Sequence, residues 1–253
     1  MRPVRLYLST GMAAVALSAA AVAGCAYNEA LGRSQFLLVD NAGLVQQADQ
    51  AWAETLRTQQ VSRDAAAIAR VRRVGGRIVE AAGLTHLSWD YAVFVNDSPN
   101  AFVLPSGKIG VTTGLLALVQ NDDQLAAVLG HEVGHVVAQH AAERYSSTAV
   151  TAIGIQAVQG MSGDYAQAVG AWGGLGAQLG VLLPFSRRHE LEADRLGIDY
   201  MVRAGYRASE AVGLWRLMAA QRQTQTPEFT STHPSDSTRI AAIEAYIREK
   251  GYN

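Results

Sequence analysis

Apolar residues in the first half of the chain recur at the spacing of an α-helix. Across residues 42–58 and again across 62–82 they return every three or four positions, with arginine and glutamine on the opposite face. This period predicts two amphipathic helices. Gly83 follows the second run and is a typical stop signal.

From Leu87 the pattern changes to short apolar runs separated by turn residues. Residues 89–95, 101–104 and 108–111 are typical of strands, and Asp97-Ser98-Pro99-Asn100 is typical of a turn. A small sheet is therefore expected in this part of the chain.

Two further helices are predicted downstream. Asn121 and the two aspartates after it can cap a helix that begins at about Asp122 and continues to about Tyr145. The stretch 184–201 predicts a second helix. Between them, 146–184 carries a single charge and eight glycines, and its apolar runs are interrupted. It favours a helical hairpin over the cleft, as a lid or membrane-facing surface, rather than a membrane span.

The N-terminus has the pattern of an export signal. Arg2 and Arg5 precede an acid-free apolar run that ends in small residues. Val22-Ala23-Gly24-Cys25 resembles the bacterial lipobox, and Cys25 is the only cysteine of the chain. We therefore expect a lipoprotein signal peptide at 1–24 and a lipidated tether at 25–40, followed by a domain at 41–253. An uncleaved membrane anchor is the alternative.

Composition bounds the class of protein. The chain has 253 residues, 49% of them hydrophobic, and a formal net charge of -1. It is long enough for one good core or two small ones, and the charge balance indicates no nucleic-acid partner. A single cysteine permits no internal disulfide and makes no cysteine cluster for a metal.

The candidate chemistry lies in the sequence HEVGH. His131 and His135 are four residues apart and therefore share a helix face, where they can bind one zinc ion. Glu132 is the residue that such sites use as a general base on the metal-activated water. The alternative is a half-buried helix that carries imidazoles by chance.

A third ligand must come from elsewhere in the chain. His140 is roughly half a turn out of phase with His131 on a continuous helix, so it should point away from the metal. Glu190 and Asp194 are four apart on the later predicted helix, so the first can reach the metal while the second orients a ligand imidazole. Glu192 should face elsewhere, and His189 is expected to be solvated or outside the ligand set.

These motifs together resemble the HtpX-like and CAAX-prenyl-protease-like zinc metallopeptidases, including their soluble, lipid-anchored (LoiP/BepA-like) bacterial branch. Besides HEVGH and Glu190 to Asp194, the resemblance includes 100–109 with the following TTGLL, and Ser231-Thr232-His233-Pro234 with Arg239. It implies a mostly helical α+β fold of the zincin-like type, with a small sheet beside the active-site helix.

The resemblance also implies roles for residues near the metal. Asn100, Ala101 and Phe102 are expected to bind substrate as an edge strand, or else to form a plain hairpin. His233 is expected either to donate to the oxyanion or to occupy the fourth zinc position at rest. Arg239 is an oxyanion donor or a salt-bridge partner.

The sequence thus predicts a zinc-dependent endopeptidase of the bacterial cell envelope that degrades misfolded or misassembled envelope proteins. Its partners would be polypeptide substrates and, through lipidated Cys25, a membrane; its expected location is the outer membrane, facing the periplasm. A chaperone or scaffold lipoprotein with little or no proteolysis is the alternative, and a zinc-dependent esterase or amidase is a third.

Overall fold

The computed structural model describes residues 25–38, 41–159, 185–221, 229, 233 and 237–252. The expected signal peptide at 1–24 lies outside these residues. So does 160–184, the larger part of the predicted hairpin. Within the described part of the chain, no helix is both long and apolar enough to cross a bilayer.

A three-stranded sheet lies at the centre of the domain, in the stretch where the sequence predicts one. Its strands are β3 (Asp90–Phe94), β4 (Ala101–Leu104) and β5 (Lys108–Thr112). The order is β3-β5-β4, with β5 parallel to β3 and antiparallel to β4. Strand β4 is therefore an edge of the sheet.

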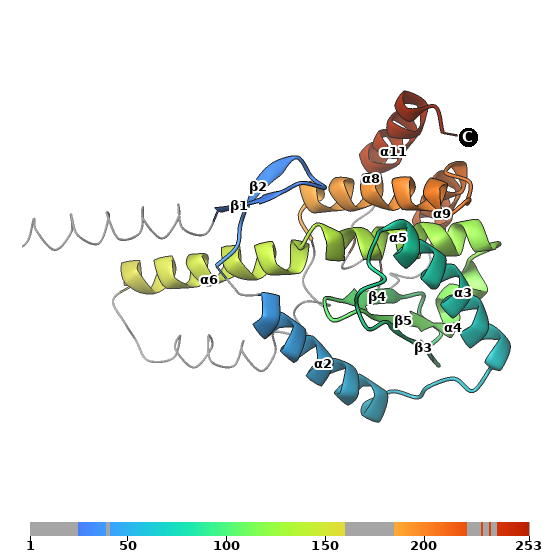
Figure 1. Cartoon of the computed structure of the whole chain (residues 1–253), viewed down its shortest axis with the longest axis horizontal. Helices are drawn as coiled ribbons and strands as arrows, with labels where there is room; N and C mark the ends of the chain where they lie inside the picture. Colours follow the sequence, from blue (N-terminus) through green and yellow to red (C-terminus); the bar gives the residue numbers. More distant parts are fainter. Residues whose placement is uncertain are drawn as a thin grey trace, which may run out of the picture.

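Helices cover both faces of this sheet, as Figure 1 shows. On one face α2 (Asn41–Thr58) contributes Trp52, which packs against Phe94 and Phe102. On the other face lie α3 (Ala65–Ala81) and α5 (Asp122–Val137), whose apolar residues form the main core with β3 and β5. The short helix α4 (Thr113–Leu118) connects β5 to the segment before α5.

Close packing of α5 on α8 (Arg187–Arg203) positions the candidate site. A Cβ built on Gly134 would lie 2.8 Å from the backbone oxygen of Ala193, and one on Gly130 would lie 2.9 Å from that of Gly197. Only glycine permits this approach. It lets side chains one turn along each helix meet across the interface. Helices α9 (Ser209–Gln221) and α11 (Ser237–Lys250) pack against this pair.

The predicted continuous helix from 122 to 145 is wrong at one point. Helix α5 ends at Val137, and α6 (His140–Gln159) begins three residues later. Gln139 has a φ of 51°, a left-handed conformation that interrupts the helical hydrogen-bond ladder. The helical phase therefore changes just before His140.

A β-hairpin occupies part of the stretch 25–40, where a tether is expected. Strands β1 (Cys25–Asn28) and β2 (Arg33–Phe36) pair antiparallel around Gly32, whose φ is 63°. Gln35 is buried and donates to the carbonyl of Ala138, at the end of α5. The hairpin therefore packs on the domain, because its polar side chains satisfy the carbonyls at a helix end.

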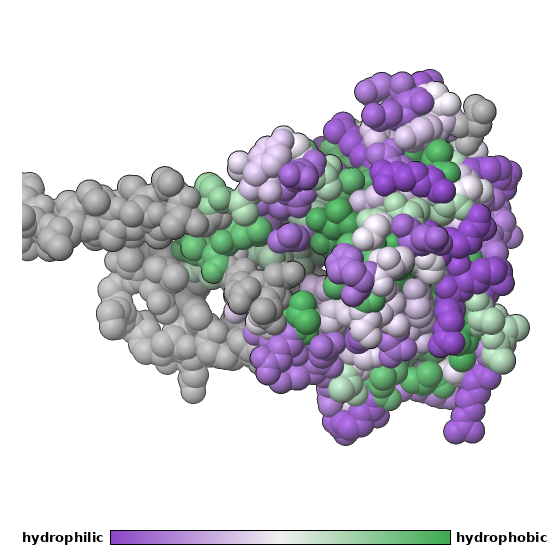
Figure 2. Space-filling model, in the orientation of Figure 1, coloured by the Kyte–Doolittle hydropathy of each residue, from purple (hydrophilic) through white to green (hydrophobic). Residues whose placement is uncertain are grey.

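Helices predominate among the described residues, and the described strands form two small sheets, so the expected mostly helical α+β fold is confirmed. Figure 2 shows hydrophilic residues over α3 and α11.

Candidate metal centre

Helix α5 carries three residues of the HEVGH motif into the interior. His131, Glu132 and His135 are 1%, 4% and 6% exposed. The Nε2 atoms of the two histidines lie 3.1 Å apart, as their four-residue spacing predicts.

Helix α8 brings two carboxylates to these histidines. The two oxygens of Glu190 lie 3.5 Å from His131 Nε2 and 3.5 Å from His135 Nε2. Asp194 Oδ1 lies 2.8 Å from His131 Nδ1, on the other side of that ring. The structure thus places Glu190 toward both Nε2 atoms and Asp194 behind His131.

His233 completes the cluster. Its Nδ1 lies 3.1 Å from His131 Nε2 and 3.1 Å from Glu190 Oε1, while its Nε2 lies 3.3 Å from Glu132 Oε1. One ligand atom from each of His131, His135, Glu190 and His233 falls within 4.8 Å of the others, and all four residues are buried.

Arg239, from α11, holds both carboxylates of α8. Its Nη1 lies 2.6 Å from Glu190 Oε2, and its Nε donates to Asp194 Oδ2 at 2.6 Å. The guanidinium also lies 3.7 Å from the ring centroid of Trp215. Of the two roles considered for Arg239, this geometry is that of a salt-bridge partner.

The electrostatics of His131, His135 and Glu190 give the protonation states that a metal requires. Burial lowers the pKa of His131 and holds that of His135 well below its ordinary value, so both rings are neutral. Burial alone would raise the pKa of Glu190, but Arg239 and neighbouring histidines hold it well below the ordinary value. Glu190 is therefore ionised.

The donor set fits a divalent metal ion. Ionised Asp194 only accepts hydrogen bonds, so His131 donates from Nδ1 and keeps a lone pair on Nε2. That lone pair faces the Nε2 of His135 and the Glu190 carboxylate at close range. A cation among these atoms would stabilise an arrangement of electron pairs that otherwise repel one another.

Glu132 differs from the other carboxylates of the site. Burial raises its pKa to about 7. The carboxylate accepts a hydrogen bond from the backbone N–H of Val103, in the edge strand β4. The general-base candidate is thus fixed against the strand that is expected to bind substrate.

The three residues expected to bind substrate are placed differently from one another. Phe102 packs against Trp52, Phe94 and Gly110, on the face of the sheet that α2 covers. The backbone N–H of Asn100 donates to Thr112 Oγ1, and its carbonyl accepts from the Thr112 N–H. Because hydrogen-bonded pairs alternate along the strand, Ala101 instead directs its backbone groups outward.

Sequence reasoning missed two residues that lie beside the cluster. His140 is fully buried, with its Nδ1 3.0 Å from His135 Nδ1, although it was expected to point away. Glu192, expected to face elsewhere, accepts a hydrogen bond from His140 Nε2 at 3.0 Å. Neither residue belongs to the cluster that could hold the metal, as expected. The interruption at Gln139 changes the helical phase, and this brings His140 behind His135 instead of onto the surface.

Two other features lie apart from the cluster. Cys25 is exposed at the start of β1, and lipid attachment there stays a prediction.

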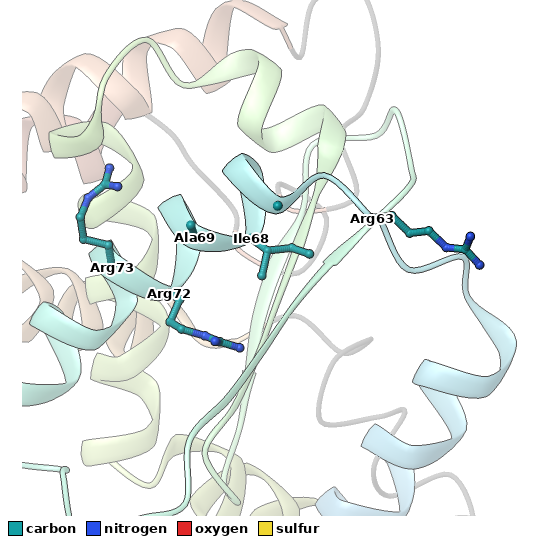
Figure 3. Close-up of a pocket in the computed structure, with 6 residues that line it drawn as sticks. Arg63, Ile68, Ala69, Arg72 and Arg73 are labelled. Atoms are coloured by element: carbon teal, nitrogen blue, oxygen red, sulfur yellow. The ribbon is translucent and has the colours of Figure 1, made fainter.

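A separate pocket lies at the start of α3. Its lining residues carry neither imidazole nor carboxylate groups, so it is not a metal site. They are Arg63, Ala65, Ile68, Ala69, Arg72 and Arg73. Figure 3 shows Arg63 and Arg73 directed away from each other.

Comparison with known proteins identifies the domain. The sequence model of peptidase family M48 matches residues 65–247. The chain belongs to this family. The expected metallopeptidase family is thereby confirmed, and the match includes all the residues of the metal cluster.

Both mitochondrial and bacterial proteins are among the M48 relatives. The mitochondrial metalloendopeptidase OMA1 of Schizosaccharomyces pombe is 40% identical over 184 residues, which cover 71% of this chain and 52% of the relative. OMA1 of Saccharomyces cerevisiae is 32% identical, with 70% of this chain and 55% of the relative covered. The β-barrel assembly-enhancing protease of Yersinia pestis is 29% identical, with 68% and 37% covered.

These relatives correct one expectation. The predicted location at a bacterial outer membrane is contradicted, because the relatives at 40% and 32% identity are mitochondrial enzymes. The matched region spans about half the length of these two proteins.

Proposed function

We propose that this M48 domain is a zinc-dependent endopeptidase. The observation that carries the proposal is the convergence of His131, His135 and Glu190 next to Glu132, inside a buried cluster. Two neutral imidazoles and one carboxylate are the ligand set of a class of catalytic zinc sites. A zinc ion bound there would polarise the scissile carbonyl and acidify water.

Glu132 is the proposed general base and acid. With a pKa of about 7 it can take a proton from the attacking water and pass it to the leaving amine near neutral pH. The hydrogen bond from Val103 keeps the carboxylate in place during both transfers. Asp194 holds the His131 ring in the orientation that presents Nε2.

The edge strand β4 is the proposed substrate-binding element. An extended polypeptide can pair with the outward backbone groups of Ala101, which places its next peptide bonds near Glu132. Asn100 and Phe102 would support this strand through Thr112 and the aromatic residues behind the sheet. Backbone pairing makes little demand on sequence, which suits unfolded or misassembled proteins as substrates.

His233 is proposed to occupy the fourth ligand position at rest. Its Nδ1 is as close to His131 Nε2 as the two motif histidines are to each other. Glu132 and Glu190 raise the pKa of His233 against the effect of burial, so the ring must lose a proton to bind a metal. In that position it would compete with water, so it must move before hydrolysis. His233→Ala should then raise the rate of peptide cleavage; a lower rate with an unchanged KM would instead assign it to the oxyanion.

The test combines metal analysis with cleavage of unfolded casein by the wild type and Glu132→Gln. We expect about one zinc per chain in both proteins, and cleavage that the variant loses by roughly 10²–10⁴-fold in kcat. Unchanged suppression of casein aggregation without any cleavage would instead support the chaperone alternative. Hydrolysis of ester or amide substrates without peptide cleavage would support the third.

A further inference from the structure

His140 lies directly behind one of the two motif histidines. It is 0% exposed, its Nδ1 lies 3.0 Å from His135 Nδ1, and its Nε2 lies 3.0 Å from Glu192 Oε2. It does not belong to the ligand cluster, because it meets the back of the His135 ring.

The direction of these hydrogen bonds follows from Glu192. An ionised carboxylate can only accept, so His140 donates from Nε2 and keeps a lone pair on Nδ1. His135 must then donate from its Nδ1 to that lone pair. The tautomer of His135 that results has its own lone pair on Nε2, the atom that faces Glu190.

Glu192 is itself held by the N-terminal hairpin. Arg33, on β2, donates to the two oxygens of Glu192 at 2.7 Å each, and its Nη1 and Nη2 donate to Glu143 at 2.7 Å and 2.8 Å. Figure 1 shows this hairpin between the start of α6 and the start of α8. Arg33 thus connects the hairpin to both helices.

We propose that His140 is a positioning residue for the metal centre, and that Glu192 and Arg33 complete a relay that sets the tautomer and orientation of His135. The inference rests on the proposed function, because it assumes that His135 binds the metal through Nε2. It gives α8 three tasks. Glu190 binds the metal, Asp194 orients His131 directly, and Glu192 orients His135 through His140.

A second metal site is the competing reading of the same residues. Ligand atoms of His140, Glu143 and His189 lie within 4.8 Å of one another. However, the Arg33 guanidinium already supplies a positive charge to Glu143 and Glu192. A dication there would be repelled by Arg33, so the contacts favour the relay.

Two substitutions of similar size separate positioning from packing. In His140→Gln the amide can accept from His135 and donate to Glu192, whereas His140→Leu can do neither. The readouts are the zinc dissociation constant, by competition with a chromophoric chelator, and the absorption spectrum of the Co²⁺-loaded protein. We expect zinc binding about 10–100-fold weaker in the Leu variant, and a smaller loss in the Gln variant.

The outcomes are distinct. If the Leu variant binds zinc as tightly as the wild type, or more tightly than the Gln variant, the relay is refuted. Two zinc ions per wild-type chain, one of them lost in both variants, would also refute it in favour of a second metal site. If the wild type binds no zinc, the proposed function itself fails.

A variant at a second position tests the relay even if the His140→Leu protein does not fold. Glu192→Met removes the acceptor at the other end of the His140 ring, at a side chain that is 16% exposed. We expect weaker zinc binding there too, with an unchanged circular dichroism spectrum. Wild-type affinity in a folded Glu192→Met protein would overturn the proposal independently.

Discussion

The two sides of the metal centre orient their histidines in different ways. On the His131 side, Asp194 contacts the ring directly at 2.8 Å, and Arg239 fixes that carboxylate. On the His135 side, the corresponding carboxylate is Glu192, one residue further from the metal cluster through His140. The first arrangement lies among α5, α8 and α11, whereas the second lies among α5, α6, α8 and the N-terminal hairpin.

This difference affects how strongly each side is held. Arg239 and Asp194 are 3% and 5% exposed, so their interactions act in a low dielectric. The side chains of Arg33 and Glu192 are 12% and 16% exposed, so solvent screens their interaction more. We therefore expect substitutions on the His131 side to have the larger effects.

The largest effect on stability is expected at Arg239. Arg239→Met leaves the Glu190 and Asp194 carboxylates buried without their cation, which should lower the free energy of unfolding by roughly 3–5 kcal/mol. Added zinc should restore more stability to the variant than to the wild type, since it supplies positive charge at Glu190. Thermal unfolding with and without zinc measures both effects.

Arg216→Met is the matched control, because it removes an arginine whose side chain is 66% exposed in its pair with Glu244 on α11. It should change the free energy of unfolding by less than about 1 kcal/mol. Equal losses of unfolding free energy in the two variants would show that the buried ion pairs of Arg239 stabilise the fold no more than an exposed pair does.

Among the substitutions that test metal binding, Asp194→Asn should have the largest effect on zinc affinity. The neutral amide no longer forces His131 to donate from Nδ1, so the zinc affinity should fall about 10–100-fold. Chelator competition measures the loss. If Glu192→Met weakens zinc binding more than Asp194→Asn does, the expectation that the His131 side has the larger effects is wrong.

Arg33→Ala tests the outer end of the His135 side and should have a smaller effect. Loss of the guanidinium loosens Glu192 without removing it, so we expect a decrease in zinc affinity of up to about tenfold. Arg188→Ala is the control, because Arg188 donates to the same carboxylate at 2.9 Å from a side chain that is 63% exposed. Equal effects of the two substitutions would argue against a specific role for the hairpin.

The pH dependence of kcat/KM should reflect Glu132, which lies between the two sides of the metal centre. Burial raises its pKa to about 7, so the carboxyl is protonated below that pH and can serve as a base only above it. A bound dication would lower this pKa, so kcat/KM should rise with pH through a midpoint at or below about 7. A rising limb centred above pH 8 would contradict this assignment of the base.

The sequence by itself determined the parts of the site that regular helices carry. The four-residue spacings of His131 with His135 and of Glu190 with Asp194 put each pair on one helix face. Short apolar runs separated by turn residues predicted the small sheet. These periodicities are local, so they needed no knowledge of the packing. The family follows from the same motifs, whereas the location did not, since the predicted outer membrane is contradicted by the mitochondrial relatives.

Only the tertiary structure decided the His135 side. The left-handed turn at Gln139 lacks the glycine or asparagine that commonly marks such a turn, so nothing in the local pattern predicts that His140 returns to His135. Glu192 reaches His140 only because glycines let α5 and α8 pack closely, and Arg33 reaches Glu192 only because the hairpin folds back onto the end of α5. Contacts between residues more than fifty positions apart depend on how helices pack, which helical periodicity does not encode.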